Sequence, residues 1–410
     1  WGYSKNGYAR IKQVDTWNYN ASATLTYRKT WNDVHNFDAM LGGELSAYHS
    51  ENITNGAYDF SEASTGVFDI GKGGVQERVD ENYATSSRMS VFGRVNYNYA
   101  QRYYIGFNMR ADGSSKFMSG SRWAYFPSVS IAWRLSEEPF MENVLWMDQF
   151  KIRASAGSSG NDRIANYAPM ALMSTNYYAI NGTEVMGMAM SSSANRKLKW
   201  ETTWQYDLGL DLSFFHNRID LSADVYFKDT RDMLYLATIS AQSGFTQQWQ
   251  NLGRVTNKGI EISLNTHNID RKNFQWSTNI TFDLSRNKVM DIGGTPFTSV
   301  NIAHGVMAND ISRIMVGQPI GVGYGYVWDG NYQLDDFIAT DKWGNVFDTP
   351  SEIVTSDNYD SFKYTLKEGV TTINSVAVQP GDRKYKDLDG NNDITSADRQ
   401  VISGSNPDFT

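Results

Sequence analysis

The chain has 410 residues and no cysteine, and its 37 basic and 45 acidic residues give a net charge of −8. This balance argues against a nucleic-acid partner, and the lack of cysteine excludes disulfides, thiolate zinc sites and a cysteine nucleophile. Aromatic residues make up 14% of the chain, whereas there are only 8 prolines. That composition favours β-strands over helical bundles. No run of about 18 apolar residues is present that could form a membrane helix.

Alternation of apolar and polar residues predicts long strands in the first part of the chain. Residues 8–31 end in such a pattern, residues 32–33 form a turn, and residues 37–45 resume the alternation. Side chains alternate across a strand, so each segment has an apolar face and a polar face. Residues 51–84 are polar, Gly-rich and aperiodic, which predicts a long loop. Residues 158–196 are expected to form a second long loop.

The stretch from Ser90 to Leu135 has the clearest pattern. Its three arms alternate throughout, and each is about ten residues long, which is the length of a tilted transmembrane strand. Tyrosines lie on both sides of the turn near Ala100, where an aromatic girdle at the membrane surface would lie. We interpret this stretch as a hairpin and a half of an outer-membrane β-barrel. Residues 136–145 are expected to contain one short helical turn.

A second regular hairpin turns at residues 215–217. Every second residue from Trp204 to Phe214 is apolar. The opposite face carries four carboxylates: Asp207, Asp211, Asp220 and Asp224. Burying them among apolar groups is untenable, so this face is predicted to be wet. A further hairpin is expected between residues 252 and 284, whereas no regular alternation continues beyond about residue 286.

Short and long connections alternate, as they do between the periplasmic turns and outer loops of membrane barrels. The turns near Ala100, His216 and Asp270 are therefore assigned to the periplasm. The loops near Ser115, Ile180 and Gly244 and residues 290–410 are assigned to the outside. About ten or eleven strands are expected, against about 22 in a plugged transporter barrel.

The predicted fold class is an all-β, antiparallel transmembrane barrel with long extracellular loops. The chain would supply about half of such a wall, and an open edge in lipid requires the other half elsewhere in the particle. Residues 1–290 are assigned to barrel strands with their loops. Residues 291–410 are assigned to a mainly extracellular loop region of the same barrel domain. The chain opens at Trp1 without the charged and apolar leader of a secreted protein, so an internal fragment is expected.

Residues 387–398, DLDGNNDITSAD, match a twelve-residue calcium loop. The candidate ligands are Asp387, Asp389, Asn391, Asp393 and Asp398. Ile394 falls at the apolar eighth position. Asn392 replaces the usual glycine, but Asn adopts the left-handed conformation most readily after Gly, so the turn is expected to survive.

Two interpretations of this loop stay open. Asp398 replaces the bidentate glutamate and offers a shorter clamp. The first interpretation is a structural Ca²⁺ ion, favoured over Mg²⁺, that pins an outer loop. The second is a turn-rich Asp/Asn/Gly loop without an ion.

No catalytic constellation is found. Residues 321–326, GVGYGY, follow no βαβ pattern, which argues against a phosphate loop. The five histidines share no i,i+4 spacing typical of metal ligands. The four carboxylates at 207–224 have the chemistry of a glycosidase pair, but lumen lining is the commoner role of such residues. Aromatic residues of the outer loops could stack on sugar rings or peptide side chains, and the substrate-binding residues are not identified.

Long blocks of the chain resemble the SusC/RagA family of TonB-dependent outer-membrane transporters. The barrel motif is similar in FGRVNYNYAQRYYIGFNMRADGSSKF and RWAYFPSVSIAWRLSEEPFM. Further similar blocks follow in family order: LKWETTWQYDLGLDLSFFHNRIDLSADVYFKDTRDML, NLGRVTNKGIEISLN, GQPIGVGYGYVWDGNYQ and PGDRKYKDLDGNNDITSADRQVISGSNPDF. The resemblance covers nearly the whole chain. The resemblance implies that the TonB box, the plug domain and the early and closing strands of a complete member would lie outside these 410 residues.

The resemblance implies TonB-dependent active import of oligosaccharides or peptides across the outer membrane, with no enzymatic activity. It also implies a SusD-like surface lipoprotein as a lid, the TonB–ExbB–ExbD complex as energy source and surrounding outer-membrane lipid, and it allows a dimer of transporter–lipoprotein pairs. Two alternatives stay open. One is a passive outer-membrane porin, and the other is a soluble β-rich glycan-binding or adhesin module.

Overall fold

A computed structural model describes residues 5–61, 69–300 and 311–402. The chain divides between Arg286 and Asn287 into two compact units, each of which is described by itself. Within the described residues, no helix has the length and apolar character needed to cross a membrane.

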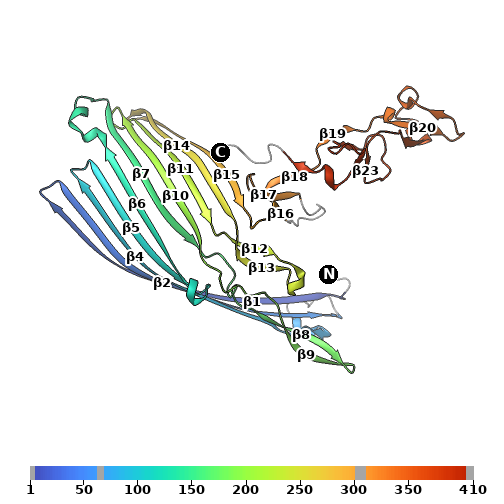
Figure 1. Cartoon of the computed structure of the whole chain (residues 1–410), viewed down its shortest axis with the longest axis horizontal. Helices are drawn as coiled ribbons and strands as arrows, with labels where there is room; N and C mark the ends of the chain where they lie inside the picture. Colours follow the sequence, from blue (N-terminus) through green and yellow to red (C-terminus); the bar gives the residue numbers. More distant parts are fainter. Residues whose placement is uncertain (1–4, 62–68, 301–310, 403–410) are drawn as a thin grey trace. The chain divides into compact units, whose positions relative to one another are not determined.

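The first unit is built on one curved antiparallel sheet (Figure 1). Its strands pair in the order β1-β2-β4-β5-β6-β7-β10-β11-β14-β15, with β3 attached to β2. Their bounds are β1 (Tyr8–Trp31), β2 (His35–Tyr58), β3 (Val75–Gln76), β4 (Asp80–Tyr99), β5 (Tyr103–Ser114), β6 (Trp123–Arg134), β7 (Met147–Asn161), β10 (Glu201–Phe214), β11 (Ile219–Arg231), β14 (Arg254–Arg271) and β15 (Phe274–Asp291). The predicted all-β antiparallel wall is confirmed, and β1 and β15 are the two edges of this sheet.

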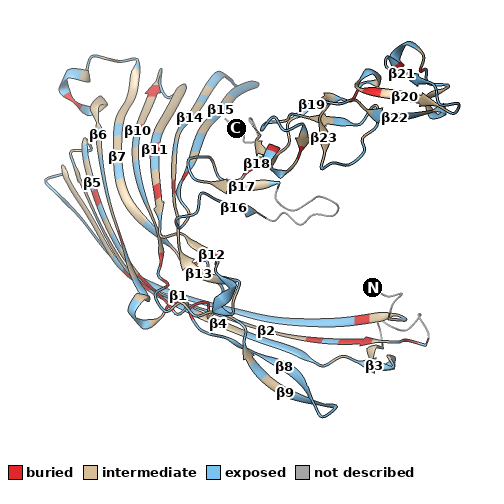
Figure 2. Ribbon diagram, turned by 45° about the vertical axis from the view of Figure 1, so that its right-hand side comes forward, coloured by how far each residue is buried: buried red, intermediate tan, exposed pale blue. Residues whose placement is uncertain are grey.

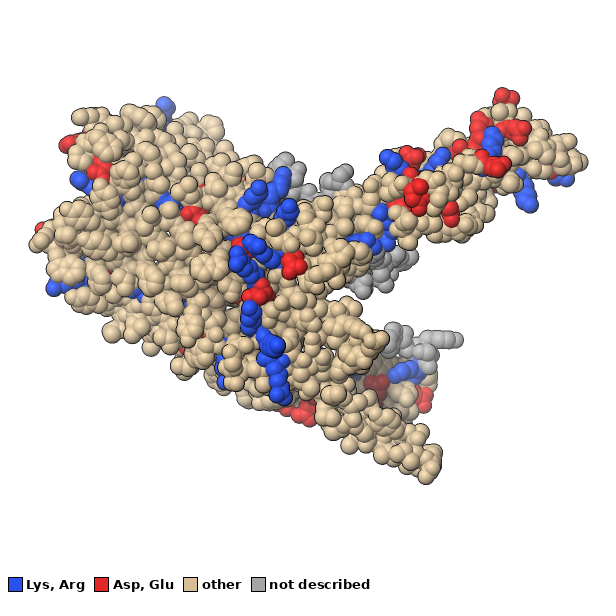
Figure 3. Space-filling view, in the orientation of Figure 1, with Lys and Arg blue, Asp and Glu red and all other residues tan. Residues whose placement is uncertain are grey.

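Much of this sheet is exposed (Figure 2), and large apolar side chains are exposed along the middle of its strands. Leu25 is 75% exposed, Leu41 61% and Leu208 57%. Figure 3 shows a surface with few charged side chains over β2 to β7. Such a continuous exposed apolar surface requires an apolar phase beside it, which for long antiparallel strands is lipid.

Aromatic side chains bound this apolar face at both ends. On β1, Trp17 and Tyr19 lie at one end of the apolar row and Tyr27 and Trp31 at the other. Near the turn at residues 100–102, Tyr99, Tyr103 and Trp133 form a stack with ring centroids 6.4 and 6.3 Å apart. Aromatic side chains at both ends of an apolar row are typical of membrane barrels, in which they lie at the two surfaces of the membrane.

Short turns gather at one end of the sheet, where the β6–β7 link of residues 135–146 also lies, and the other long connections lie at the opposite end. Residues 32–34, 100–102 and 272–273 each link two strands at the first end. Both Ala100 and Gln101 have a positive φ, the left-handed backbone conformation that lets the chain reverse direction within three residues. The β6–β7 link contains two 3-10 turns, η3 (Leu135–Glu137) and η4 (Pro139–Met141), where one helical turn was predicted.

The predicted loop over residues 51–84 is wrong at both ends. β2 continues to Tyr58 and β4 begins at Asp80, and Ile53 pairs with Glu81. These segments are polar on both faces because they extend past the apolar row, so they show no alternation. Backbone pairing with β1 and β4 nevertheless satisfies their N–H and C=O groups.

The predicted loop over residues 158–196 is also wrong in part. It contains a hairpin of β8 (Met173–Ile180) and β9 (Thr183–Met190). The turn is Asn181-Gly182, with φ of 52° and 77°. Asn-Gly is the strongest local signal for a hairpin, but the residues on either side of it show no regular alternation of apolar and polar side chains. A second small hairpin, β12 (Leu234–Thr238) with β13 (Gln247–Asn251), lies in the β11–β14 connection.

The long connections enclose the main buried cluster of the first unit. Phe117, Ile164, Leu198 and Trp200 come from three different connections and pack against Phe126. Trp200 Nε1 donates a hydrogen bond to the Arg122 carbonyl oxygen at 2.9 Å. This cluster holds the connections together at that end of the sheet.

The second unit is made of short strands around a small core. Its strands are β16 (Phe297–Val300), β17 (Ser312–Met315), β18 (Val322–Gly325), β19 (Trp328–Asn331), β20 (Phe337–Asp341), β21 (Val346–Phe347), β22 (Phe362–Leu366), β23 (Thr372–Ile373), β24 (Arg383–Tyr385), β25 (Asp393–Ile394) and β26 (Gln400–Val401). Tyr332, Phe337, Ala339 and Ile394 are almost completely buried. Strands of two to five residues are too short to show a period, which explains why alternation ends near residue 286.

Candidate functional site: the polar wall and the carboxylate loop

The predicted wet face carries a network of arginines and carboxylates. The register places Arg153 of β7 beside β10, and Asp211 opposite Ser222 of β11. Arg153 Nε and Nη2 donate to the two carboxylate oxygens of Asp211 at 2.8 and 2.9 Å. Its Nη2 also lies 3.0 Å from Asp224 Oδ1. One guanidinium therefore holds together three strands of the wall.

Gly209 leaves the room that this guanidinium occupies. A Cβ at position 209 would lie 2.7 Å from Arg153 Cζ and would also overlap Asp224. Contacts below 3.0 Å require something to move, and here the neighbours are fixed by hydrogen bonds to each other. Glycine is needed at this position because the arginine crosses β10 directly above its backbone.

A second network lies on the same face over β2, β4 and β5. Arg110 Nη2 donates to Glu44 at 3.0 Å and to Ser90 at 2.8 Å, while its Nε donates to Asp112 at 2.8 Å. Ser90 is 2% exposed and Asp112 7% exposed. Nearer the short turns, Arg28 and Arg94 both bind Asp38, at 2.7 and 3.1 Å. A hollow of about 440 Å³ lies beside this last group.

The long-connection end of the sheet has its own ion pairs. Arg88 binds Asp162, which is 6% exposed and also accepts a hydrogen bond from Ser114 at 2.8 Å.

On the apolar face, the row of apolar side chains along β11 ends at Asp229. Arg254 binds the Asp229 carboxylate through both Nε and Nη2, at 2.8 and 2.9 Å. A desolvated carboxylate with a bidentate arginine cannot face hydrocarbon, so the apolar row ends at this level.

These networks make a polar wall, not a catalytic site. Asp211 and Asp224 share one guanidinium, so neither is placed as a free proton donor for glycoside hydrolysis. Opposite charges paired across strands keep the face hydrated and fix the register.

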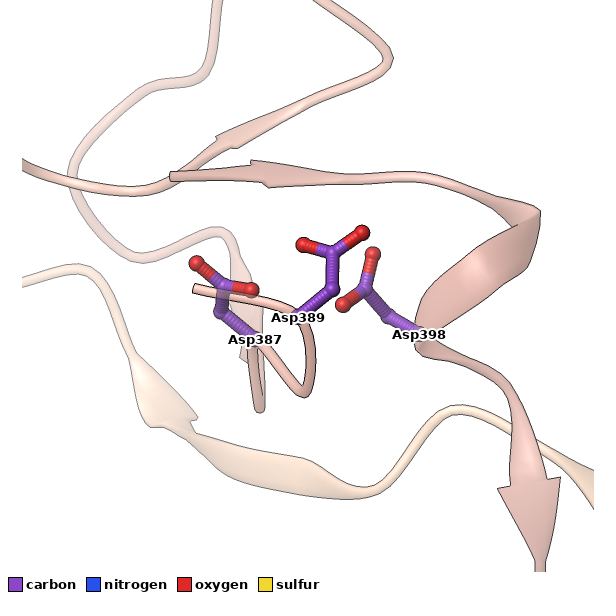
Figure 4. Close-up of side chains that lie close together, drawn as sticks. All are labelled: Asp387, Asp389 and Asp398. Carbon is purple, nitrogen blue, oxygen red and sulfur yellow. The ribbon is translucent and has the colours of Figure 1, made fainter. Parts of the chain in front are cut away.

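The carboxylate loop of the second unit places three of its five predicted ligands together. Asp387, Asp389 and Asp398 each offer an oxygen within 4.8 Å of the others (Figure 4). Asp393 and Asn391 turn elsewhere. The Asp393 carboxylate accepts hydrogen bonds from Thr372 Oγ1 at 2.6 Å and from the Ser375 backbone at 2.9 Å.

The backbone of the loop follows the predicted turn. Asn392 has a φ of 61°, the left-handed conformation expected when asparagine replaces glycine. Asp387 accepts hydrogen bonds from the backbone N–H groups of Gly390 and Asn392 at 2.7 and 2.8 Å. Ile394 is fully buried, as expected for the eighth position.

Hydrogen bonds to backbone N–H groups stabilise the ionised form of Asp398. Thr395 N–H and Leu388 N–H each donate to this carboxylate at 2.8 Å and hold its pKa below the usual value. The pKa of Asp393 is likewise lowered, first by Thr372 and then by the Ser375 backbone. Both carboxylates are therefore charged at neutral pH.

The residues present fit a calcium ion in part. Positions one, three and twelve converge, and the seventh residue of such a loop uses its carbonyl oxygen, so the outward Asp393 side chain is compatible. The fifth position does not reach inward, because Asn391 donates to Asp389 at 3.0 Å and accepts from the Asp393 backbone at 2.7 Å. Calcium binding stays a prediction.

Comparison with known proteins identifies the class of protein that this wall belongs to. A family model described as "TonB dependent receptor-like, beta-barrel" matches residues 1–407. The chain belongs to this family, and it is part of an outer-membrane β-barrel.

Individual proteins that are similar to the chain support the same family. TonB-dependent receptor P3 of Formosa agariphila is 33% identical over 410 residues, covering all of this chain and 38% of that protein. TonB-dependent receptor SusC of Bacteroides thetaiotaomicron is 30% identical over 302 residues, covering 72% of this chain and 29% of SusC. A solved structure of the RagAB peptide transporter superposes with a TM-score of 0.71 at 23% identity, covering 87% of this chain and 38% of that chain. The chain thus spans well under half the length of the relatives it matches.

The family settles two further expectations. TonB-dependent receptors are transporters and not enzymes, so the expectation that this chain is not an enzyme is confirmed. The resemblance to SusC/RagA transporters is confirmed as well. The alternative of a soluble β-rich module is wrong, because the chain belongs to a family of outer-membrane β-barrels.

Proposed function

We propose that this chain forms about half of the wall of a TonB-dependent importer that carries oligosaccharides or peptides across the outer membrane. One observation supports this above all. The same strands carry an exposed apolar row on one face and paired arginines and carboxylates on the other. A wall of this kind separates lipid from a hydrated lumen.

The edges of the sheet indicate what completes the wall. Within the part of the chain that the structure describes, the 24-residue strand β1 pairs in this sheet with β2 alone, and β15 pairs in it with β14 alone. Unpaired backbone groups at a lipid-exposed edge cost several kcal/mol each, by the usual estimate of about 2–7 for an unsatisfied amide. We infer that further strands of the receptor pair with both edges and that a plug fills the lumen.

The proposal extends to partners and to sides of the membrane. The relatives include SusC and the RagAB peptide transporter, and on that basis the receptor would work with a SusD-like surface lipoprotein and the TonB–ExbB–ExbD complex. The long connections, residues 291–410 included, would then lie outside the cell and the short turns in the periplasm. A passive porin, which would need neither TonB nor a lipoprotein, is the weaker alternative, because the long connections and the match to TonB-dependent receptors count against it.

Uptake by living cells tests this function. Cells that depend on the receptor would be given fluorescent oligosaccharides and, separately, fluorescent peptides of similar size. We expect uptake of one class to stop when either the receptor gene or TonB is deleted. Uptake that persists without TonB but stops without the receptor would favour a porin.

A purification from detergent-solubilised outer membranes tests the partner. A lipoprotein that stays with the receptor through purification supports the proposed lid. A receptor that is isolated alone, at mild detergent concentrations that preserve its barrel, contradicts it.

A further inference from the structure

The β8–β9 hairpin has an unusual concentration of methionine. Five of the 15 methionines in the chain lie between residues 170 and 190. Residues 172–191 contain no His, Cys, Asp, Lys or Arg, and Glu184 is their one ionisable carboxylate. The hairpin is exposed on most of its length (Figure 2).

The register gathers the sulfur atoms on one face. Met173 pairs with Met190, Thr175 with Met188 and Tyr177 with Met186. Side chains alternate across a strand, so all four methionines share this face. Their exposed fractions are 57%, 65%, 63% and 61% for Met173, Met186, Met188 and Met190. Thioethers exposed to this degree contribute little to packing in the chain itself.

Near the tip of the hairpin, an arginine contacts this face. Arg78 lies 3.9 Å from the ring centroid of Tyr177, and its Nη2 is 3.2 Å from Glu184 Oε1. The guanidinium therefore places a positive charge beside Tyr177 and its partner Met186, and it neutralises the one carboxylate. The three remaining methionines, at the base of the hairpin, stand away from this charge.

We propose that Met173, Met188 and Met190 form a binding site for a soft monovalent metal ion, Cu(I) or Ag(I). Directly opposed residues have Cβ atoms about 5 Å apart and diagonal ones about 7–8 Å, within reach of the long methionine side chain. Residues two apart on one strand are about 7 Å apart. Three thioethers can thus meet at one ion without rearrangement of the backbone.

The ligand chemistry selects the ion. A thioether is neutral, polarisable and soft, and soft sulfur ligands favour Cu(I), whereas Ca²⁺ and Mg²⁺ require oxygen ligands. Glu184, which is paired to Arg78, is the single carboxylate of this hairpin, whereas Ca²⁺ takes six or more oxygen ligands. The ion would bind in the oxidation state in which it arrives, so no electron transfer is involved. This inference does not depend on the transport function.

Replacement of methionine by leucine separates this site from an apolar docking face. Leucine keeps the volume and apolar character of methionine and removes the sulfur. A surface that docks a protein or touches lipid would tolerate the exchange, whereas a metal site would not. The matched control replaces three exposed methionines on separate strands of the wall: Met89, Met109 and Met290.

The experiment uses the receptor as it is assembled in the outer membrane, purified in detergent and chloride-free buffer. Silver nitrate is titrated calorimetrically, and Cu(I), held reduced with ascorbate, is offered in competition with a coloured Cu(I) chelator. We expect M173L/M188L/M190L to weaken Ag(I) and Cu(I) binding at least about tenfold and M89L/M109L/M290L to leave both unchanged.

A second readout locates the ion. In receptor labelled with ¹³C at the methionine methyl groups, the resonances that shift on addition of Ag(I) should be those missing from M173L/M188L/M190L. The proposal is overturned if the unaltered receptor binds neither ion. It is equally overturned if the hairpin variant binds both as well as the control does, or if the shifted resonances survive in the hairpin variant.

Discussion

Single residues decide how the polar wall is held together. Arg153 binds Asp211 and Asp224 from neighbouring strands, and Gly209 provides the space above the backbone for its guanidinium. Arg110 has a similar role over β4 and β2 through Ser90 and Glu44. The arginines thus fix cross-strand register on a face where apolar packing does not.

Gly209→Ala should therefore destabilise the assembled barrel by about 1–3 kcal/mol, the usual cost of forcing extra volume into a packed site. The midpoint of guanidinium-induced unfolding of the receptor in detergent measures the change. The matched control is Gly93→Ala in β4, where a Cβ would meet its neighbours at ordinary distances of 3.6 and 3.9 Å. Equal midpoints for the two variants would contradict the role given to Gly209.

The charge of Asp398 should make the second unit sensitive to acid. Its pKa is lowered in the folded state, so its contribution to stability is present above the ordinary aspartate pKa of about 3.9 and is lost as pH falls through the lower folded value. Asp393 acts in the same direction. Hydrogen exchange of the Leu388 and Thr395 amides should stay slow from pH 7 to about 5 and lose protection below about 4, after correction for intrinsic exchange.

Asp398→Asn gives the matched comparison for this acid sensitivity. It keeps an oxygen acceptor but removes the charge, so the protection of these amides should be weaker at neutral pH and should change little with acid. Protection of Leu388 in the unaltered receptor that is constant down to pH values well below the ordinary pKa would show that the carboxylate charge is unimportant.

At the scale of elements, the two faces of each strand should differ in whether they tolerate a charged substitution. Leu208 of β10 lies on the apolar face, and its neighbour across β7 is Ala154. Leu208→Arg should cost about 2–4 kcal/mol in the membrane. Ser155→Arg, at the same depth but on the polar face opposite Asp207, should be tolerated. Heat modifiability on SDS gels measures assembly, and failure of the Ser155 variant with success of the Leu208 variant would reverse the two faces.

The carboxylate loop can be tested as an element by adding and removing metal. If Ca²⁺ binds at Asp387, Asp389 and Asp398, Ca²⁺ should slow hydrogen exchange over residues 387–398 relative to a chelator, and Mg²⁺ at the same concentration should do so less. Asp387→Asn should abolish the difference. Identical exchange in Ca²⁺ and chelator would establish the ion-free loop, held by its own turns.

At the scale of the whole molecule, the open edges of the sheet set a requirement. Among the described residues, β1 and β15 end the strand order of this sheet, and lipid offers the backbone groups of an open strand edge no hydrogen-bonding partner. Residues 1–410 expressed alone should therefore not yield a heat-modifiable, protease-resistant barrel in detergent or liposomes, whereas the complete receptor should. A stable monomeric barrel formed by these residues alone would show that β1 and β15 can close on each other.

Much of the wall follows from sequence because its pattern is local. Alternation over ten or more residues assigns Leu208 and Asp207 to opposite faces without knowledge of any partner. Turn chemistry is local as well, and the Asn181-Gly182 turn could have identified the β8–β9 hairpin within the predicted loop. Short strands such as β23 and β25 give no such signal, because two residues cannot define a period.

The sequence by itself determined an antiparallel membrane wall, its apolar and polar faces, and the left-handed turn at Asn392. The tertiary structure alone decided which side chains meet. Arg153 reaches Asp211 and Asp224 because pairing sets residues 58 and 71 positions apart side by side. Within the carboxylate loop, three of the five predicted ligands converge. Asp393 does not join them, because Thr372 and Ser375, from another strand and turn, bind its carboxylate. Such contacts depend on register between distant segments, which no local period encodes.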